Sequence, residues 1–371
     1  MSLYIIGFPG KYIQGPGALE RLYPILAGKP AAMVCDEFVW DLVGRTIVEK
    51  AEAGGSRIHR TRFQGETTQK ELDALLAVCR EHNVSFIIGL GGGKAMDTAR
   101  AGMHHARLPL IIIPTTASTD APCSSLTGLY SEQHEHLQSI RTGKNPDYVI
   151  VDSSIIINAP KYSFVCGMGD ALATCFEAEA VYKSGKDNSH GGRPLRMGLE
   201  LSKFCLETEL RYGREALAAI DRKEITPAFE AVLEANILLS GVGFESGGLA
   251  AAHGLHTAMT GDPGFAPAPH GAKVAFCTMV QLILEDMTGQ DRKSMINTLI
   301  AFYEDCGLPY CAADFGPPGT DEELKGRFKE MAGRALGNPN NHIHKMPIAM
   351  TVDLLTDALL KTSELKKNGR Y

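Results

Sequence analysis

Three short segments of this chain carry side chains that are able to hold a metal ion. Asp170 lies in GMGDALATCFEA, His253 and His256 lie in GLAAAHGLHTAM, and His270 lies in PGFAPAPHGAKVAF. Each segment is on, or at the start of, an apolar helix-like stretch. One carboxylate and two imidazoles, with a position left for substrate, form a donor set for a catalytic divalent metal. The same residues also fit a purely structural interpretation, as a helix cap and as buried histidines bonded to backbone carbonyls.

A glycine-rich turn, GLGGGKAMDTAR at residues 89–100, closes a predicted buried strand and opens a predicted helix. Glycines let backbone N–H groups approach phosphate oxygens, and the helix N-terminus adds partial positive charge. The turn is not a standard dinucleotide fingerprint, because Lys94 stands where the third glycine is required. It is not a Walker loop either, because Ala95 replaces Ser or Thr. A phosphate-binding turn upstream of a metal site suggests a metal-assisted reaction with a nucleotide cofactor, although such glycines also serve tight packing.

Two more polar positions follow predicted strands. The turn PTTASTDAPCS, residues 114–124, places five hydroxyl side chains around the carboxylate of Asp120. Ligands of open α/β sheets bind beyond the carboxyl ends of the strands, although a hydrogen-bonded turn explains the same composition. Asp36 ends its own strand, where a carboxylate accepts ribose hydroxyls and repels a 2′-phosphate. This position favours NAD over NADP.

Composition limits the class of protein. The 371 residues are enough for two domains, and 44% hydrophobic with 22% charged residues is typical of a soluble globular protein. A net charge of −6, without a basic run interleaved with aromatics, argues against nucleic-acid binding. The nine cysteines are scattered without a CxxC pair, which indicates reduced, buried thiols. With no signal-peptide pattern and no apolar run of membrane-spanning length, we expect a cytoplasmic protein without a membrane partner.

The pattern of elements changes near residue 160. Before it, buried strands alternate with helical stretches, which predicts a parallel sheet covered on both faces; the predicted strands are Ala31–Asp36, Arg57–Phe63, Phe86–Leu90, Leu110–Ile113 and Tyr148–Asp152. After it, strand patterns vanish and long stretches rich in Ala, Leu and Glu follow. We therefore predict an α/β fold: a Rossmann-like parallel-sheet domain over residues 1–159 that binds the nucleotide, and an all-helical domain over 160–371 that binds metal and substrate.

Taken together, seven segments resemble the glycerol dehydrogenases, a branch of the iron-containing (group III) alcohol dehydrogenase superfamily. They are PGKYIQGPGAL, GLGGGKAMDTAR, IPTTASTDAPCSSL, GKNPDYVIVD, GMGDALAT, GLAAAHGLHTAM and HGAKVAF. The resemblance runs beyond His344 and so covers nearly the whole chain, and PTTASTDAPCS is its most specific part. The Pro-rich approach to His270, GDPGFAPAPHGAK, departs from the polar, His-containing run that is frequent in the family. The stretch SGKDNSHGGRPLR (184–196) and the C-terminal segment GNPNNHIHKM are also unusual for the family. These departures bear on the walls of the substrate pocket.

The resemblance implies a dehydroquinate synthase-like architecture, with the active site in the cleft between the two domains. It implies a divalent metal, zinc in glycerol dehydrogenases, on Asp170, His253 and His270. Asp120 and His256 would be catalytic, with His256 near the metal and the nicotinamide without being a ligand. The implied NAD-binding residues are Asp36, Gly92, Gly93, Lys94, Asp97, Thr115, Ser118, Ser124, Leu126 and Tyr130. The resemblance also implies homo-oligomers, as octamers or smaller multiples.

The expected reaction is oxidation of glycerol, or a related vicinal diol, to dihydroxyacetone by zinc-assisted hydride transfer to NAD. One alternative is a dehydrogenase of the same superfamily that acts on a hydroxy acid or glycerol phosphate, and another is a dehydroquinate synthase-type lyase. Both need basic residues for an anionic substrate, and the metal-bearing segments offer mainly Lys273. A third alternative is a non-catalytic NAD- or metal-binding protein, which the four intact residues Asp120, Asp170, His253 and His270 disfavour.

Overall fold

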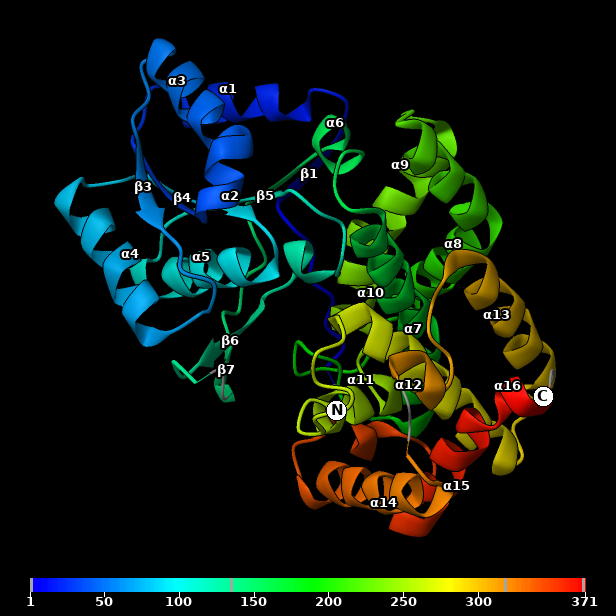
Figure 1. The fold of residues 1–371 in the computed structure, drawn as a ribbon. Coiled ribbons are helices and arrows are strands. Elements are labelled where there is room, and N and C mark those ends of the chain that lie inside the picture. The colour runs from blue at the N-terminus through cyan, green and yellow to red at the C-terminus, as the bar shows by residue number, and fades with distance from the viewer. Residues whose placement is uncertain (1–2, 134–135, 317–318, 369–370) are drawn as a thin grey trace. The chain divides into compact units, whose positions relative to one another are not determined.

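The computed structural model describes residues 3–133, 136–316, 319–368 and 371. Contacts divide the chain into two compact units, drawn in Figure 1. The sheet unit comprises Gly7–Ser163 and Ala219–Gly241, and the helical unit comprises Met1–Ile6, Phe164–Ala218 and Val242–Tyr371. The predicted domains, 1–159 and 160–371, were each continuous in sequence. The structure instead groups the N-terminal segment with the helical unit, where the Asn188 side chain donates to the Ile5 carbonyl at 2.7 Å, and groups residues 219–241 with the sheet unit.

The sheet unit is built on six parallel strands in the order β1-β8-β5-β4-β2-β3. Their bounds are β1 Lys11–Gly15, β2 Ala31–Cys35, β3 Ile58–Arg62, β4 Phe86–Gly91, β5 Leu110–Pro114 and β8 Tyr148–Asp152. β2 and β5 are buried along their whole length, because helices cover both faces of a parallel sheet. The five predicted strands are all present. β1, a half-exposed edge strand, and the antiparallel hairpin of β6 (Leu126–Tyr130) and β7 (His136–Arg141) were not predicted.

Helices flank this sheet on both sides (Figure 1). The helices of the sheet unit are α1 Leu22–Leu26, α2 Glu37–Val39, α3 Arg45–Ala53, α4 Gln69–Glu81, α5 Gly93–Ala106, α6 Ser153–Ile156 and α9 Pro227–Glu234. The hydrophobic core on one face joins Met33, Ile88 and Ile111 of the strands to Leu22 and Ile47 of the helices. Burial of such side chains contributes roughly 1.5–3 kcal/mol each to folding. The core therefore holds the carboxyl ends of β2, β4 and β5, and the polar turns that follow them, in fixed positions.

The described residues after position 160 form helices and no strand, as predicted. The bounds are α7 Lys161–Ser184, α8 Arg196–Arg222, α10 Ser240–Gly247, α11 Ala251–Met259, α12 His270–Met287, α13 Lys293–Cys306, α14 Asp321–Gly337, α15 Val352–Ser363 and α16 Leu365–Asn368. α7 and α12 are buried around most of their circumference, so their apolar residues do not form a single stripe. The fold class is therefore confirmed: a Rossmann-like parallel-sheet region is followed by a helical region.

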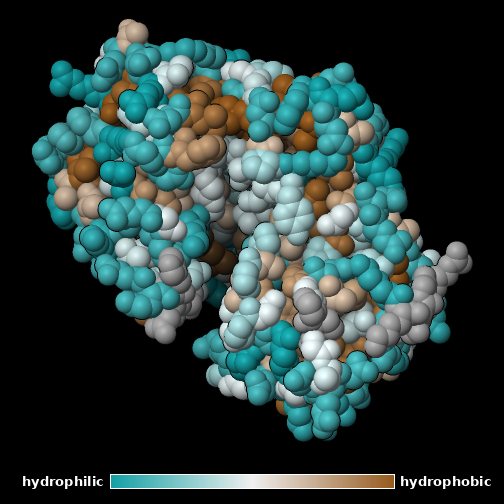
Figure 2. All heavy atoms as spheres, viewed as in Figure 1, coloured by the Kyte–Doolittle hydropathy of each residue, from teal (hydrophilic) through white to brown (hydrophobic). Residues whose placement is uncertain are grey.

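One helical segment, Pro227–Gly247, is apolar and long enough to cross a membrane by length and composition. However, 72% of its most apolar window is buried inside the protein. Packing in the core accounts for its apolar character, so the segment is weak evidence for a membrane span. The face of the molecule in Figure 2 is mostly hydrophilic, with scattered hydrophobic residues between the polar ones.

Candidate metal centre and phosphate-binding turn

Asp170, His253 and His270 come together in the helical unit from three different helices. Asp170 lies on α7, His253 near the start of α11, and His270 is the first residue of α12. The Asp170 Oδ1 atom lies 3.3 Å from His253 Nε2 and 3.1 Å from His270 Nε2. One ligand atom from each residue lies within 4.8 Å of the other two, and no other His, Cys, Asp or Glu group in the described residues has this spacing. The donor set and the spacing fit one divalent cation.

Glycines next to these residues allow the helices to approach closely enough. A Cβ on Gly169 would lie 2.6 Å from the Gly271 carbonyl oxygen, and a Cβ on Gly271 would lie 1.8 Å from the carbonyl oxygen of Cys166. Both distances are far below van der Waals contact. Gly254, which follows His253, is equally confined, because its Cβ would lie 2.4 Å from Asn341 Oδ1. Each of the three candidate ligands therefore has a neighbouring glycine at which a Cβ would clash with another part of the chain.

Glu177 is a functional residue that the sequence interpretation missed. It is fully buried on α7, seven residues after Asp170, and its Oε2 lies 2.6 Å from His253 Nδ1. Its Oε1 accepts from the backbone N–H groups of Ala250 at 2.8 Å and His253 at 2.9 Å. A carboxylate at Nδ1 favours the tautomer whose proton is on Nδ1, which leaves the Nε2 lone pair for a metal. The available signal was the spacing: residues seven apart share a helix face, and a glutamate in a buried apolar helix requires a partner.

The electrostatics of this cluster favour a cation. Burial raises the pKa of Asp170, but His270 and His253 outweigh burial and hold that pKa well below its usual range. Burial likewise opposes protonation of His253, yet Glu177 and Asp170 raise its pKa well above the usual value. Two buried carboxylates thus favour a positive charge at this position. A divalent cation takes the place of an imidazole proton when it binds.

His256 lies beside the cluster, one turn after His253 on α11. Its ring centroid is 4.3 Å from that of His270 and 6.3 Å from that of His253. Burial and then the two neighbouring histidines lower its pKa well below the usual value, so the imidazole is neutral. His256 is not a member of the group of three ligand atoms.

The glycines of the turn before α5 have three different roles. Gly89 packs closely, since its Cβ would meet Ala99 at 2.9 Å, and Gly91 has φ +139°, which favours glycine. Gly92 and Gly93 face open space: a Cβ on Gly92 would meet nothing within 4 Å, and one on Gly93 only Thr119 Oγ1 at 4.0 Å. Gly92 is the N-cap of α5, and no side chain among the described residues caps this end of the helix. Open space beside uncapped N–H groups fits a phosphate.

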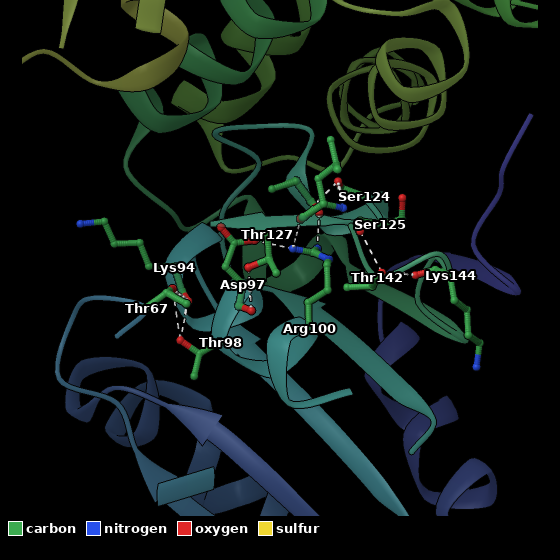
Figure 3. Close-up of polar contacts among 12 residues, drawn as sticks. Thr67, Lys94, Asp97, Thr98, Arg100, Ser124, Ser125, Thr127, Thr142 and Lys144 are labelled. Carbon is green, nitrogen blue, oxygen red and sulfur yellow. Dashed lines mark hydrogen bonds and ion pairs between the residues drawn. The ribbon is translucent and has the colours of Figure 1, made fainter. Parts of the chain in front are cut away.

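Lys94 and Asp97 are engaged in ion pairs of the protein itself, and Figure 3 draws the pair of Asp97 with Arg100. Lys94 Nζ lies 2.8 Å from Glu66 Oε2, and Asp97 pairs with the fully buried Arg100. Burial raises the pKa of Asp97 to about 6, although Arg100 opposes the shift. Arg100 also donates to the carbonyls of Ala121 at 2.5 Å and Leu126 at 3.1 Å. Arg100 and Glu66, which were not predicted, therefore fasten the start of α5 to the segments around it.

The other predicted cofactor residues gather around the start of α5. Thr115 N–H donates to the Gly91 carbonyl at 3.1 Å, and the Ser118 hydroxyl lies 3.3 Å from that of Thr116. Leu126 and Tyr130 lie on β6, which Thr127 joins to α5 by donating to the Asp97 carbonyl at 3.0 Å. Ser124 Oγ accepts from the Leu126 N–H at 2.8 Å. These residues thus come from two segments, the turn after β5 and the strand β6 of the hairpin.

Asp36 and Asp120 both lie after the carboxyl ends of strands in the sheet unit. Asp36 caps α2, where its Oδ1 accepts from Val39 N–H at 2.8 Å. Asp120 is buried, and its Oδ2 accepts from Ser240 Oγ at 2.8 Å. Gly241 supports this contact, because a Cβ there would lie 2.9 Å from the Asp120 carbonyl oxygen. The turn that carries Asp120 is therefore held against the start of α10.

Known proteins share both the sequence and the fold. A family model described as iron-containing alcohol dehydrogenase matches residues 9–153. The chain is 38% identical to the glycerol dehydrogenase of Pseudomonas putida over 361 residues, which cover 96% of each protein. The chain belongs to the glycerol dehydrogenase branch of the iron-containing alcohol dehydrogenases. The resemblance inferred from the motifs is confirmed.

Two further relatives show that proteins similar to this chain are named for different substrates. The solved structure of glycerol dehydrogenase from Schizosaccharomyces pombe is 34% identical and aligns with a TM-score of 0.92, covering 100% of this chain and 94% of that one. The glycolaldehyde reductase of Halobacterium salinarum is 37% identical over 98% of each chain. Relatives at nearly equal identity are thus named for different small substrates, so identity alone does not define the substrate.

Proposed function

We propose that this protein is an NAD-dependent polyol dehydrogenase that oxidises glycerol, or a related vicinal diol, to dihydroxyacetone or the corresponding hydroxyketone. The substrate loses a hydride to NAD⁺ and a proton to the protein and solvent, so the products are the ketone, NADH and H⁺. The observation that carries the proposal is the buried cluster of Asp170, His253 and His270 in a chain 38% identical to a glycerol dehydrogenase.

We assign zinc to this cluster, with Asp170, His253 and His270 as the ligands. The fit rests on the spacing of the three ligand atoms and on the Glu177 contact, which directs His253 Nε2 toward Asp170. When bound, the metal supplies Lewis acidity that lowers the pKa of a substrate hydroxyl. Three protein ligands leave a position for substrate oxygens. Imidazole and carboxylate also suit iron, which the family description names, so metal analysis must distinguish the two.

The residues of the sheet unit have the features needed to bind NAD. The uncapped start of α5, with open space beside Gly92 and Gly93, suits the pyrophosphate. Asp36, at the end of β2, suits a ribose hydroxyl and disfavours the 2′-phosphate of NADP. Asp120 follows β5 at the edge of the sheet where such folds bind ligands. We therefore assign Asp120 to hydrogen bonding and proton relay at the substrate, and the neutral imidazole of His256 to a second relay position.

Reduction of a small hydroxyaldehyde is a second candidate, supported by the 37% identity to a glycolaldehyde reductase. It uses the same hydride transfer in the opposite direction. Anionic substrates are less well supported, because Lys273 is buried and its Nζ lies 3.3 Å from the Ala266 carbonyl oxygen. A hydroxy acid, glycerol phosphate or lyase substrate would need a basic group directed toward it.

A substrate panel tests the proposal. Diols, polyols, hydroxyaldehydes and hydroxy acids are assayed with NAD⁺, NADH, NADP⁺ and NADPH, before and after chelation and after adding back Zn²⁺ or Fe²⁺. We expect NAD-dependent turnover that is highest with vicinal diols and lost on chelation. Turnover that survives complete removal of metal would contradict the metal assignment, and preference for an anionic substrate would contradict the polyol assignment.

We also propose a cytoplasmic location and a homo-oligomeric state. All nine cysteines are buried, which suits thiols kept in a reducing compartment. The homo-oligomeric state is the assembly that the family resemblance implies. Light scattering coupled to gel filtration measures the assembly, and a monomer at micromolar concentration would contradict it.

A further inference from the structure

His270 lacks the kind of support that orients His253. His253 Nδ1 is held by the buried carboxylate of Glu177 at 2.6 Å, whereas no hydrogen bond to His270 Nδ1 is formed by any described residue. The His270 side chain is also the most exposed of the three, at 36%, against 10% for His253 and 1% for Asp170. Its position therefore depends on the backbone that delivers it.

That backbone is a short loop between α11 and α12, residues 260–269. The loop is folded into tight turns, in which the N–H groups of Phe265 and Ala266 donate to the Asp262 carbonyl at 3.0 and 2.8 Å. Pro269 then occupies the N-cap position of α12, directly before His270. Any shift of this loop moves the first residue of α12 and, with it, the candidate ligand.

A bidentate ion pair ties the loop to α14. Arg327 donates through Nε to Asp262 Oδ2 at 3.0 Å and through Nη2 to Asp262 Oδ1 at 2.6 Å. The same Oδ1 accepts from Gly264 N–H at 2.9 Å, so the carboxylate also shapes the turn. The Asp262 side chain is only 6% exposed and that of Arg327 is 30% exposed. A forked, partly buried pair of this kind restrains orientation as well as distance.

An aromatic cluster secures the other side of the loop. Phe265 is 2% exposed, and its ring lies 5.2 Å from that of Phe315 and 6.2 Å from that of Phe276 on α12. The guanidinium carbon of Arg327 lies 5.0 Å from the centre of the Phe265 ring. Arg327 therefore contacts the loop twice, through the Asp262 carboxylate and through an aromatic face.

We propose that Arg327, acting through Asp262, is a positioning residue that fixes His270 for metal binding. The inference rests on the metal centre of the proposed function. It gives a role to the Pro-rich segment GDPGFAPAP, whose Asp262 pairs with Arg327, 65 positions later on α14. The ion pair replaces, at the level of the loop, the hydrogen bond that no described residue makes to His270 Nδ1.

The test measures metal affinity rather than activity. Zn²⁺ is titrated against a chromophoric chelator for the full-length wild type, Arg327→Met, Arg327→Lys, Asp262→Asn and the double variant Asp262→Asn/Arg327→Met. We expect Arg327→Met and Asp262→Asn, which each break the ion pair, to weaken Zn²⁺ binding on the order of 10–100-fold. This loss is typical of groups that orient a metal ligand. The double variant should lose no more than either single variant, because both break the same interaction. Arg327→Lys should be intermediate, since lysine keeps the charge without the fork.

Two readouts separate positioning from loss of structure. Co²⁺ replaces Zn²⁺, and its visible absorption bands, which depend on ligand geometry, should shift in the variants at saturating metal. Arg214→Gln is the matched control, because Arg214 pairs with Asp305 at 2.5 Å at a half-exposed site in the same unit. It should leave Zn²⁺ affinity and the Co²⁺ spectrum unchanged. If Arg327→Met fails to fold, Arg327→Lys and Asp262→Asn decide the question.

Folded Arg327 and Asp262 variants that bind Zn²⁺ as tightly as wild type, with an unchanged Co²⁺ spectrum, would overturn the inference. A wild-type protein that binds neither ion at micromolar concentration would instead contradict the metal centre itself. The two failures are therefore distinguishable in one set of titrations.

Discussion

Replacing Glu177 with glutamine should weaken metal binding while changing the shape of the site very little. The glutamine oxygen still accepts from the backbone N–H groups of Ala250 and His253, as Oε1 does now. Its NH₂ group, however, takes the place of the oxygen that lies 2.6 Å from His253 Nδ1. Two donors cannot share a hydrogen bond. The imidazole must either lose this contact or move its proton to Nε2, the atom that faces Asp170 at 3.3 Å.

Either outcome reduces the ability of Nε2 to bind a cation. Loss of a group that orients a histidine ligand typically costs about 10–100-fold in metal affinity. That range corresponds to about 1.4–2.8 kcal/mol of binding free energy. The free energy of unfolding of the metal-free variant should also fall by about 1–3 kcal/mol, because a buried N–H donor at this contact is left without an acceptor.

The assay is Zn²⁺ competition against a chelator at pH 7.5, with urea unfolding of the metal-free protein in parallel. Glu179→Gln is the matched control, since Glu179 lies on the same helix but binds Lys183 and Arg292, each at 2.7 Å, and is not part of the cluster. It should leave Zn²⁺ affinity within about twofold of wild type, the spread expected for an uninvolved site. If Glu177→Gln binds Zn²⁺ as tightly as Glu179→Gln, the carboxylate does not set the tautomer of His253 and the reasoning fails.

Four further substitutions test the candidate site and the pH dependence of stability. His270→Ala should lose the metal while keeping the fold, measured by metal analysis and circular dichroism; a fully loaded variant would refute its role as a ligand. Asp36→Gly should raise the ratio of catalytic efficiencies for NADP over NAD, because it removes a carboxylate near the expected 2′-phosphate, and an unchanged ratio would show that Asp36 does not face the ribose. Asp120→Asn should lower turnover on the order of 10²–10⁴-fold with cofactor and metal binding nearly intact, and near-wild-type turnover would make it only a turn residue held by Ser240. Glu209 is fully buried, and neither of its carboxylate oxygens has a hydrogen-bond partner among the described residues, so burial raises its pKa well above the usual value of 4.5. The folded protein then keeps a proton that the unfolded chain releases, and stability should fall as pH rises above 4.5, by up to about 1.4 kcal/mol per pH unit until the folded-state pKa is passed. Glu209→Gln should remove this decline in urea midpoints, and an unchanged pH profile would contradict it.

Local patterns were sufficient for most elements of the fold. The helix predicted over residues 69–81 coincides with α4, because its apolar residues recur at helical spacing on one face. The five buried strands were visible as short apolar runs. β1 was not visible, since an edge strand that is half exposed needs no apolar run, and the β6–β7 hairpin was missed for the same reason. Strand order also depends on which strands meet in space, and no local pattern contains that information.

The sequence by itself determined the chemistry available: an aspartate and three histidines on apolar helices, each candidate ligand beside a glycine, and a glycine turn before α5. Without the family resemblance, the sequence left open which of the three histidines bind the metal. Only the tertiary structure brings Asp170, His253 and His270 within 4.8 Å, because this distance depends on how α7, α11 and α12 cross. The contacts of Glu177 with His253 and of Arg327 with Asp262 also depend on the tertiary structure. Glu177 and Arg327 lie 76 and 65 residues from His253 and Asp262, respectively, so helix packing, and not periodicity along the chain, makes them part of the site.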